Sequence, residues 1–419
     1  MSSDKKYTGK LPPHWRENKV GSVYKERITK VSDKDFPPLS VTKKGVVPQL
    51  DTVAKTNDNE NRKLVKKDDF VINSRSDRRG SCGISKIDGS VSLINTVLEP
   101  IDSGKYCNSY YDWFFHTENF ADEFFRWGHG IVDDLWTTRW LDMKNIEIPY
   151  PPLDEQRRIA DFLDDKCAQI DEITEELEEK IVKLEEYKQS LISEKTFNGF
   201  SKIGERKNSG IPWVGNLPET WNKLLAKYIF VQRNERGNKN NLELLSPTQN
   251  YGVIPQTLYE KLSGMTAVKL NSGVNLNALK TIHKGDYCIS LRSFEGGFEY
   301  SNYEGVVSPA YQVFYAYKEI DKRYYKYLFK TKEFIAEMNS HTLSIRDGKP
   351  ISFSDFQNTL LPYPPLEEQK RIADFLDDKC AQIDEITEET RKEIDTLKQY
   401  KQSLIYEYVT GKKGVPSNE

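Results

Sequence analysis

The sequence predicts a protein of the α+β class, in which two globular mixed α/β domains are joined by two long helices packed as an antiparallel intramolecular coiled coil. Three observations support this prediction. An internal repeat divides the 419 residues into two similar halves, two long stretches carry a seven-residue apolar period, and short apolar-aromatic runs lie elsewhere. With 37% apolar residues, including 23 Tyr and 19 Phe, the chain has enough apolar material for two packed cores.

The internal repeat is clearest where the two predicted helices begin. Residues 149–176 and 362–389 are identical at 26 of 28 positions, and both differences exchange residues of like charge. The chain is therefore two copies of one unit, each a variable block followed by a nearly invariant one. The predicted segments are a globular domain at 1–150, a helix at 151–200, a second globular domain at 201–363 and a second helix at 364–419.

Each nearly invariant block predicts one long helix with an apolar stripe. After its Pro-Pro start, about 40 residues pass without Gly or Pro, which corresponds to roughly 60 Å of helix. An apolar stripe of this length must be buried against another helix, either the second copy in the same chain or a second molecule in a homodimer. Ile159, Ile173 and Tyr187 are assigned to the alternate core position of the first helix, with Lys166 and Lys180 as polar interruptions, and Thr390 breaks the phase of the second. The residues assigned to helix–helix contact are Leu163, Ile170, Ile173, Leu177, Leu184, Leu191, Leu376, Ile383, Ile386, Leu397 and Leu404.

The two variable blocks differ from the helices in charge and pattern. Residues 1–150 and 201–363 carry net charges of +2 and +6, whereas 151–200 and 364–419 carry −7 and −4, so the total of −3 hides two basic blocks. Short runs such as residues 70–72 and 287–289, bounded by turn-forming residues, are typical of β-strands. Residues 324–338 have the amphipathic rhythm of a helix.

Several classes of function lack their motifs in this sequence. There is no P-loop, and Gly128-His129-Gly130 lacks the third glycine of a dinucleotide-binding loop. The Asn-Pro-Pro-Tyr/Phe motif of amino-methyltransferases is missing too. Five scattered cysteines and five scattered histidines indicate neither a zinc site nor a disulfide framework, so we expect no metal. No apolar run is long enough for a membrane helix and the first residues lack an apolar stretch, so we expect a cytoplasmic protein without membrane contact.

A polar loop after the predicted strand at 70–72 carries the side chains that suit DNA. Arginine forks match guanine edges or phosphates, asparagine can pair with adenine, and serine can bind phosphate. The matching stretch of the second block, residues 288–297, keeps an arginine, Arg292, at the position of Arg75, and the rest of its loop differs. The alternative is a solvated hairpin whose arginines pair with nearby carboxylates. The candidate DNA-binding residues are Asn73, Arg75, Arg78, Arg79, Ser81, Lys43 and Lys44 in the first block, with Arg62, Lys63, Lys66 and Lys67 as further phosphate candidates, and Arg292, Ser293, Asn302, Tyr303, Arg346 and Lys349 in the second block.

The motifs and their arrangement resemble the specificity subunit of type I restriction–modification enzymes. The resemblance covers essentially the whole chain. It rests on the Pro-Pro-Leu-Asp/Glu-Glu-Gln-Arg/Lys-Arg-Ile-Ala start of both helices, on residues 209–218 with Trp221, and on the helix ends at 191–195 and 404–408. One departure is at the N-terminus, where Tyr7-Thr8-Gly9-Lys10 replaces the Pro-Trp-x-Gly that precedes Leu217.

The resemblance implies a non-catalytic subunit with defined partners. Each globular domain would be a target recognition domain that binds one half of a split site on double-stranded DNA, and the helices would fix the length of the unread spacer. The helices would also dock two modification subunits that methylate adenine, and two ATP-driven restriction subunits would complete the complex. S-adenosylmethionine, ATP and Mg are then expected on the partner subunits, with no cofactor bound by this chain. The alternative from another class is a coiled-coil scaffold whose basic domains bind protein.

Overall fold

The computed structural model describes residues 7–49, 60–75, 79–102, 104–130, 136–201, 205–237, 242–266, 276–290, 297–340 and 351–416. The chain divides into two compact units. Unit 1 is residues 1–178 with 391–419, and unit 2 is residues 179–390. Each unit therefore combines one globular domain with part of both long helices, and each is described by itself.

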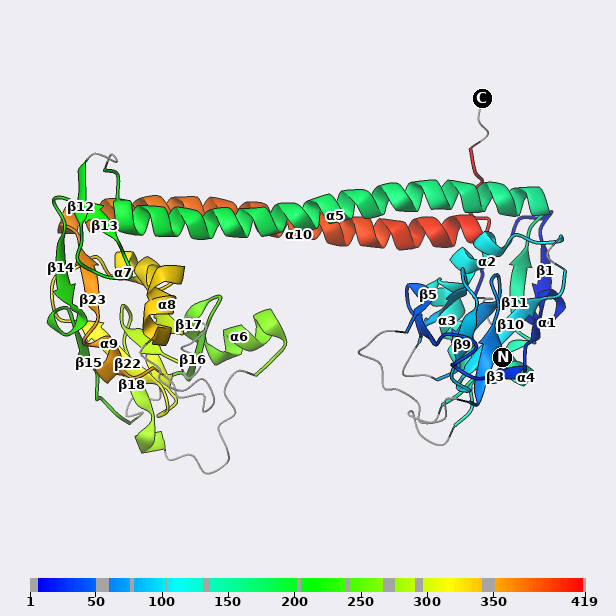
Figure 1. Cartoon of the computed structure of the whole chain (residues 1–419), viewed down its shortest axis with the longest axis horizontal. Coiled ribbons are helices and arrows are strands. Elements are labelled where there is room, and N and C mark those ends of the chain that lie inside the picture. The colour runs from blue at the N-terminus through cyan, green and yellow to red at the C-terminus, as the bar shows by residue number, and fades with distance from the viewer. Residues whose placement is uncertain are drawn as a thin grey trace. The chain divides into compact units, whose positions relative to one another are not determined.

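The globular part of unit 1 is a four-stranded antiparallel sheet covered by two short helices (Figure 1). The strand order is β2-β10-β7-β8, and smaller sheets are formed by β1-β11, β3-β6-β9 and β4-β5. The strands are β1 Arg16–Lys19, β2 Tyr24–Glu26, β3 Lys30–Val31, β4 Leu39–Thr42, β5 Gly45–Pro48, β6 Arg62–Val65, β7 Phe70–Asn73, β8 Cys82–Ile84, β9 Gly89–Val91, β10 Asn95–Pro100 and β11 Glu147–Tyr150. The helices are α1 Val20–Val23, α2 Asn108–Phe115, α3 Glu118–Arg126, α4 Trp140–Met143 and the long α5 Leu153–Asn198.

The predicted strand at residues 70–72 is confirmed, and its side chains serve two cores. Phe70 and Ile72 pack in the aromatic core under α2 and α3, where the rings of Phe70 and Phe115 lie 4.2 Å apart. Val71 points to the other face and packs in a smaller core with Val65 and other aliphatic residues. Successive strand residues face opposite sides of a sheet, so a fully apolar strand fits a sheet buried on both faces.

Unit 2 repeats this plan with a second four-stranded antiparallel sheet, in the order β15-β22-β19-β20. Smaller sheets are formed by β12-β13, β14-β23, β16-β17 and β18-β21. The strands are β12 Arg206–Asn208, β13 Asn216–Pro218, β14 Asn222–Leu225, β15 Phe230–Gln232, β16 Leu245–Thr248, β17 Gly252–Pro255, β18 Lys280–Ile282, β19 Tyr287–Ile289, β20 Phe298–Tyr300, β21 Gly305–Val307, β22 Gln312–Ala316 and β23 Leu360–Tyr363. The helices are the 3₁₀ turns η4 Ala226–Tyr228 and η5 Leu276–Ala278, then α6 Gln256–Ser263, α7 Lys322–Leu328, α8 Lys332–Ser340, α9 Phe353–Phe356 and the long α10 Leu366–Val409.

The amphipathic stretch at 324–338 forms two helices, α7 and α8, rather than one continuous helix. The break lies at Thr331, whose hydroxyl accepts a hydrogen bond from the Phe334 amide at 3.3 Å. A threonine in this role caps the start of a new helix, because it satisfies an amide that has no partner in the preceding turn. Thr117 does the same between α2 and α3, where its hydroxyl accepts from the Phe120 amide at 3.2 Å.

Both units also share a buried ion pair beside the central sheet. The Arg27 guanidinium donates to both carboxylate oxygens of Asp69, at 2.7 and 3.0 Å. In unit 2 Arg233 binds Asp286 in the same way, at 2.6 and 3.1 Å. Because two such pairs stand at corresponding places, the two globular domains are copies of one fold, although their loops differ.

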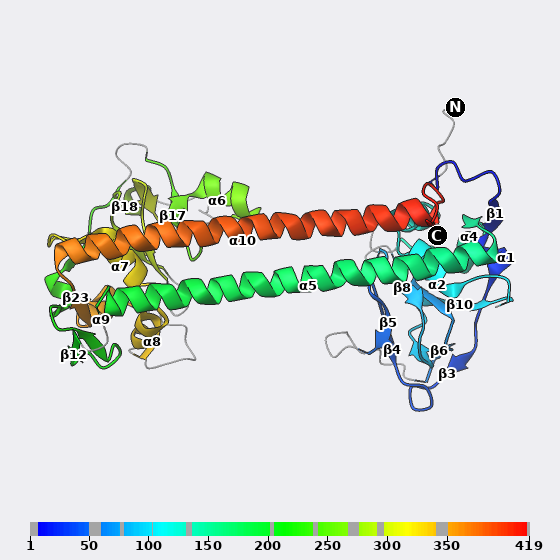
Figure 2. The ribbon, with the colours of Figure 1, turned by 90° about the horizontal axis from the view of Figure 1, so that it is seen from above.

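The two long helices lie side by side in each unit and run in opposite directions (Figure 2). In unit 1, Lys401 of α10 pairs with Asp171 of α5 at 2.6 Å, and three residues before it in α10 Lys398 pairs at 3.1 Å with Glu178. In unit 2 the equivalent pair is Lys188 with Asp384, at 2.5 Å. As the residue number rises along one helix it falls along its neighbour, so the contact is antiparallel within each unit.

The residues between the two helices recur at alternating intervals of three and four positions. Some of the residues predicted for this stripe lie outside it. The stripe of buried and half-buried residues is 160, 163, 167, 170, 174, 177, 181, 184, 188 and 191 in α5, and 373, 376, 380, 383, 387, 390, 394, 397, 401 and 404 in α10. The assignments of Ile173, Tyr187 and Ile386 to this stripe are wrong, since 44%, 57% and 40% of these residues are exposed. Thr390 stays in the stripe, where its hydroxyl donates to the Ile386 carbonyl at 2.8 Å.

No helix in the described ranges combines the length and the apolar character that crossing a membrane requires.

Candidate nucleic-acid interface

The candidate loop of unit 1 begins where β7 ends and returns into β8. The Asn73 amide donates to the Ser81 carbonyl at 2.9 Å, which closes the base of the loop. The Asn73 side-chain oxygen accepts from the Arg75 amide at 3.0 Å, so asparagine shapes the turn that carries the first arginine. Local sequence chemistry thus positions Arg75 at the edge of the sheet.

The two described arginines of this loop have different surroundings. Arg75 is exposed and makes no ion pair with another described residue, and an arginine side chain carries five N–H donors. The Arg79 guanidinium lies 5.2 Å from the centre of the Phe125 ring and forms an ion pair with Asp122. Arg79 is therefore held against α3, whereas Arg75 points into solvent.

The structure also brings the two predicted lysines of the β4–β5 turn towards this edge. Lys43 and Lys44 are exposed at the tip of the hairpin, and Gly45 follows with a φ of 105°, which favours glycine. The hairpin lies directly against β8, since a Cβ built on Gly83 would come within 2.7 Å of the Gly45 backbone. Two lysines and Arg75 thus project from adjoining elements of unit 1.

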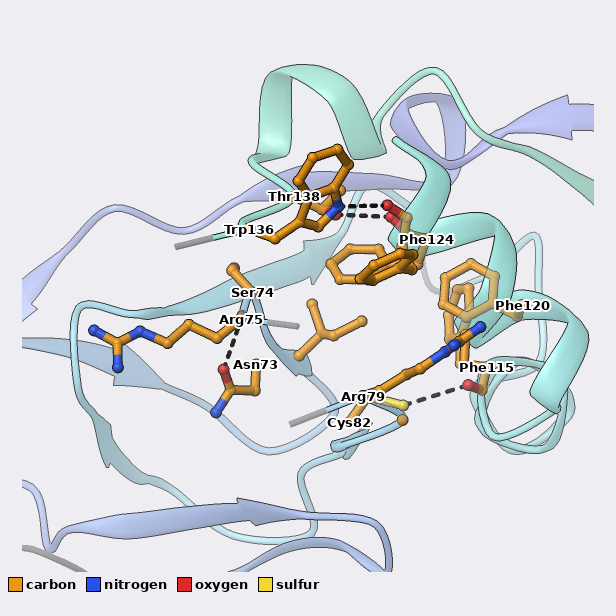
Figure 3. Close-up of a pocket in the computed structure, with 14 residues that line it drawn as sticks. Asn73, Ser74, Arg75, Arg79, Cys82, Phe115, Phe120, Phe124, Trp136 and Thr138 are labelled. Carbon is orange, nitrogen blue, oxygen red and sulfur yellow. Dashed lines mark hydrogen bonds between the residues drawn. The ribbon is translucent and has the colours of Figure 1, made fainter. Parts of the chain in front are cut away.

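A pocket opens beside the arginine loop, between β7 and α3 (Figure 3). Its walls are the aromatic side chains of Phe124, Phe125 and Trp136, and Asn73 and Arg75 stand at its edge. The Trp136 indole donates to the Phe125 carbonyl at 2.9 Å, and the Thr138 hydroxyl donates to the Phe124 carbonyl at 2.7 Å. Sequence reasoning missed these residues, because they lie about 50 residues from the loop and no local pattern connects them to it.

Several other predicted residues are placed away from this edge or buried. Ser81 is only 6% exposed and its carbonyl closes the loop, so it is not available to a phosphate and that assignment is wrong. The assignment of Arg62 is also wrong: it is buried, its guanidinium donates to Ser90, and burial lowers the pKa of the side chain. In this position the arginine connects β6 to β9 and is not available to a ligand.

The remaining lysine candidates of unit 1 lie at the other end of β7. Lys63 pairs with Glu26 at 3.2 Å, and Lys66 pairs with Asp88 at 2.8 Å. The amide of Lys67 donates to the same Asp88 carboxylate. These lysines precede the strand and the arginine loop follows it, so the structure does not gather them into one surface.

In unit 2 the described candidates are also separated from the equivalent loop. Asn302 and Tyr303 are exposed in the turn after β20, where the Tyr303 amide donates to the Ser301 hydroxyl at 3.3 Å. The loop between β19 and β20 meets the other end of the same strand. Five candidates lie outside the described residues, namely Arg78, Arg292, Ser293, Arg346 and Lys349.

The described side chains at this edge are exposed cations, an amide and aromatic rings. Within the described ranges, no three His, Cys, Asp or Glu side chains are grouped closely enough to hold a metal ion. Burial raises the pKa of the Cys82 thiol at the floor of the pocket, which keeps it protonated and a poor nucleophile.

Comparison with known proteins identifies the family. The family model described as the type I restriction modification DNA specificity domain matches residues 15–183 and again 218–396. The MjaVIII specificity subunit of a type I restriction enzyme from Methanocaldococcus jannaschii is 27% identical over 283 residues, or 64% of this chain and 62% of that protein. The EcoBI specificity subunit from Escherichia coli is 37% identical over 79 residues, which cover 19% of this chain and 16% of that protein. The alignment thus spans less than two thirds of the Methanocaldococcus relative.

Two solved structures share the fold. One comes from work described as the structural basis underlying complex assembly and conformational transition of the type I R-M system; it has a TM-score of 0.69 and 16% identity, with 96% of this chain and 100% of that chain covered. The HsdS subunit from Thermoanaerobacter tengcongensis has a TM-score of 0.53 and 18% identity, with 96% and 98% covered. Since the family model matches most of the chain, in both halves, this protein belongs to the type I restriction–modification DNA specificity family.

Proposed function

We propose that this chain is the DNA-recognition subunit of a type I restriction–modification complex and that it binds a bipartite site on double-stranded DNA. Each globular domain binds one half of the site. The observation that carries the proposal is a duplicated framework with unlike loops. The sheets and the Arg27–Asp69 and Arg233–Asp286 pairs correspond, whereas the loops that begin after β7 and β19 differ in sequence. Two copies of one fold with different loops suit two different half-sites.

The two long helices act in this proposal as an antiparallel intramolecular coiled coil that fixes the unread spacer. Their contact stripe alternates at intervals of three and four residues, as knobs-into-holes packing requires. Lysines at 188 and 401 complete the stripe by pairing with carboxylates of the neighbouring helix. The helices contain 46 and 44 residues, so each is about 65–70 Å long.

The outer face of the helices is the proposed docking surface for two modification subunits. Ile173 and Tyr187 are exposed on α5, and Ile386 and Tyr400 are exposed at the equivalent positions of α10. Apolar side chains that the helix pair leaves in solvent at helical spacing suit an amphipathic partner helix. Because the surface is present twice, it suits two identical partners.

Catalysis belongs to the partners in this proposal. The modification subunits bind S-adenosylmethionine and methylate adenine, and two restriction subunits use ATP and Mg. The residues of this chain bind, orient and space the DNA. The sequence contains neither the Asn-Pro-Pro-Tyr/Phe motif nor a P-loop, which supports this division of labour.

The decisive experiment is methylome sequencing of a host that carries this chain with its modification partner, followed by binding assays on the motif found. We expect methylated adenines within one split motif, and an affinity for that motif that falls steeply as salt rises. Binding to protein with no dependence on a DNA motif would favour a coiled-coil scaffold and contradict the proposal.

A further inference from the structure

The pocket beside the arginine loop is too small to enclose a base. It spans about 370 Å³ when the open volume at its mouth is included, whereas its enclosed part has room for only one group the size of a water molecule. A flipped base requires a cavity that encloses its whole ring. The pocket therefore suits one small group presented from outside.

The surface that the pocket offers to such a group is apolar. The polar atoms of its walls are already engaged: the Trp136 indole and the Thr138 hydroxyl donate to backbone carbonyls of α3 (Figure 3). The Ser74 hydroxyl lies 2.8 Å from that of Thr96, and the Cys82 thiol donates to the Phe115 carbonyl at 3.4 Å. Aromatic faces and engaged polar groups favour an alkyl ligand over water or an ion.

The position of the pocket connects it to base reading. Asn73 and Arg75 stand at its edge, and they are the described side chains of the loop that can reach base edges in the proposed function. The C5-methyl of thymine is the apolar group that an unmodified base pair displays in the major groove. We propose that this pocket receives the C5-methyl group of a thymine, next to the base pair contacted by Arg75, in the half-site bound by unit 1.

Unit 2 carries larger side chains on the corresponding helix. Thr117 and Thr331 cap α3 and α8 in the same way, which aligns the two helices residue by residue. Ala121, which lines the pocket, then corresponds to Ile335. The inference is therefore specific to unit 1, and it rests on the proposed function because it needs this loop to face DNA.

The test replaces each thymine of the motif in turn by deoxyuridine, which lacks only the methyl group. The complex with the modification partner is used, and its affinity for each DNA is measured. We expect one position in the half-site of unit 1 to lose roughly three- to fivefold in affinity, the effect of withdrawing one buried methyl group. A half-site of unit 1 without thymine, or one insensitive to every replacement, would overturn the inference while leaving the proposed function intact.

Two variants connect the effect to the pocket. Ala121→Ile fills it with the residue found in unit 2. Gly128→Ala disturbs the tryptophan wall from behind, since a Cβ there would lie 2.3 Å from the Trp136 Nε1. Both variants should bind the thymine and the deoxyuridine DNA with equal affinity. Their affinity for the deoxyuridine DNA should match that of the unchanged protein, which also shows that the variants fold. Ile335→Ala in unit 2 is the control and should keep the difference. A thymine preference that survives in both variants would overturn the inference, whereas binding without any motif would overturn the proposed function as well.

Discussion

The hydroxyl of Tyr110 donates a hydrogen bond of 2.7 Å to the backbone carbonyl of Val409, although 299 residues separate them. The bond ties the first globular domain to the last turn of α10 within unit 1. In unit 2 the corresponding Tyr324 donates to the Thr196 carbonyl, near the end of α5, at 2.9 Å. The first globular domain is thus bonded to the end of α10, the helix that follows the second domain in the sequence. The second globular domain is bonded near the end of α5, the helix that follows the first.

Replacing Tyr110 with Phe should loosen this attachment. Burial raises the pKa of Tyr110 well above its usual value, so the hydroxyl stays protonated and donates throughout the physiological range. Its loss leaves the Val409 carbonyl without this donor in a buried place, and the free energy of unfolding should fall by about 1–2 kcal/mol. Hydrogen exchange should quicken in the last turns of α10 and not at the end of α5. Tyr324→Phe should show the reverse pattern, and equal exchange at both helix ends in either variant would contradict the assignment.

Replacing Arg75 with Ala should weaken recognition of one half-site only. The exposed guanidinium has no ion-pair partner among the described residues, so a base contact would supply about 1–3 kcal/mol of discrimination. Binding to DNA with altered bases in each half-site measures the effect. Arg157→Ala is the matched control, because Arg157 is an exposed arginine at the start of α5, near Asp154 and outside the pocket. An equal loss on every DNA sequence would reassign Arg75 to phosphate binding.

Lengthening the helices should lengthen the spacer of the DNA motif. One heptad adds about 10 Å of helix, or about three base pairs of DNA rise. Inserted at equivalent positions of both helices, within 170–190 and its counterpart in α10, it keeps the contact stripe in phase. Inserted in α5 alone, it should unbalance the helix pair and lower stability. Methylome sequencing reads the spacer, and an unchanged spacer in the double insertion would show that the helices do not set it.

Charging the exposed apolar positions of the helices should weaken binding of the modification subunits without unfolding the chain. Ile173→Asp and Ile386→Asp place a carboxylate where the proposal has a partner helix. Either change alone should remove one partner copy, and both together should remove two, as measured by the mass of the complex. Val182→Asp is the control, because Val182 is also exposed but projects from another face of α5. A complex of unchanged mass with the double variant would exclude this surface.

Stability of unit 2 should depend on pH through Glu299. The carboxyl group is buried on β20, and burial raises its pKa to about 7, although Lys330 lies 2.6 Å away and partly offsets the shift. The folded protein therefore holds a proton that the unfolded chain releases, so stability falls as pH rises from about 4.5 to 7. Glu299→Gln should remove this dependence, which is worth about 3 kcal/mol at most. Denaturant unfolding between pH 5 and 8 measures it, and parallel pH profiles of the two proteins would contradict the shift.

The sequence by itself determined the duplication, the two long helices, the strands at 70–72 and 287–289, and the family. A repeat and a period are local patterns, and they are visible before the chain folds. The sequence did not determine which side of each helix is buried. On a helix, the positions three and four residues after a leucine or isoleucine of the stripe both lie next to it. Only packing against the second helix buries Cys167 and Thr174 and leaves Ile173 exposed.

The tertiary structure alone decided which polar residues remain available. Arg62 and Arg75 are the same residue type, yet Arg62 is buried and donates to Ser90 whereas Arg75 is exposed. The pocket likewise joins β7 to Trp136, a contact between distant segments that no local pattern records. Burial and long-range contacts depend on the packing of the whole chain. Whether a side chain is buried or solvated depends on neighbours that are distant in the sequence.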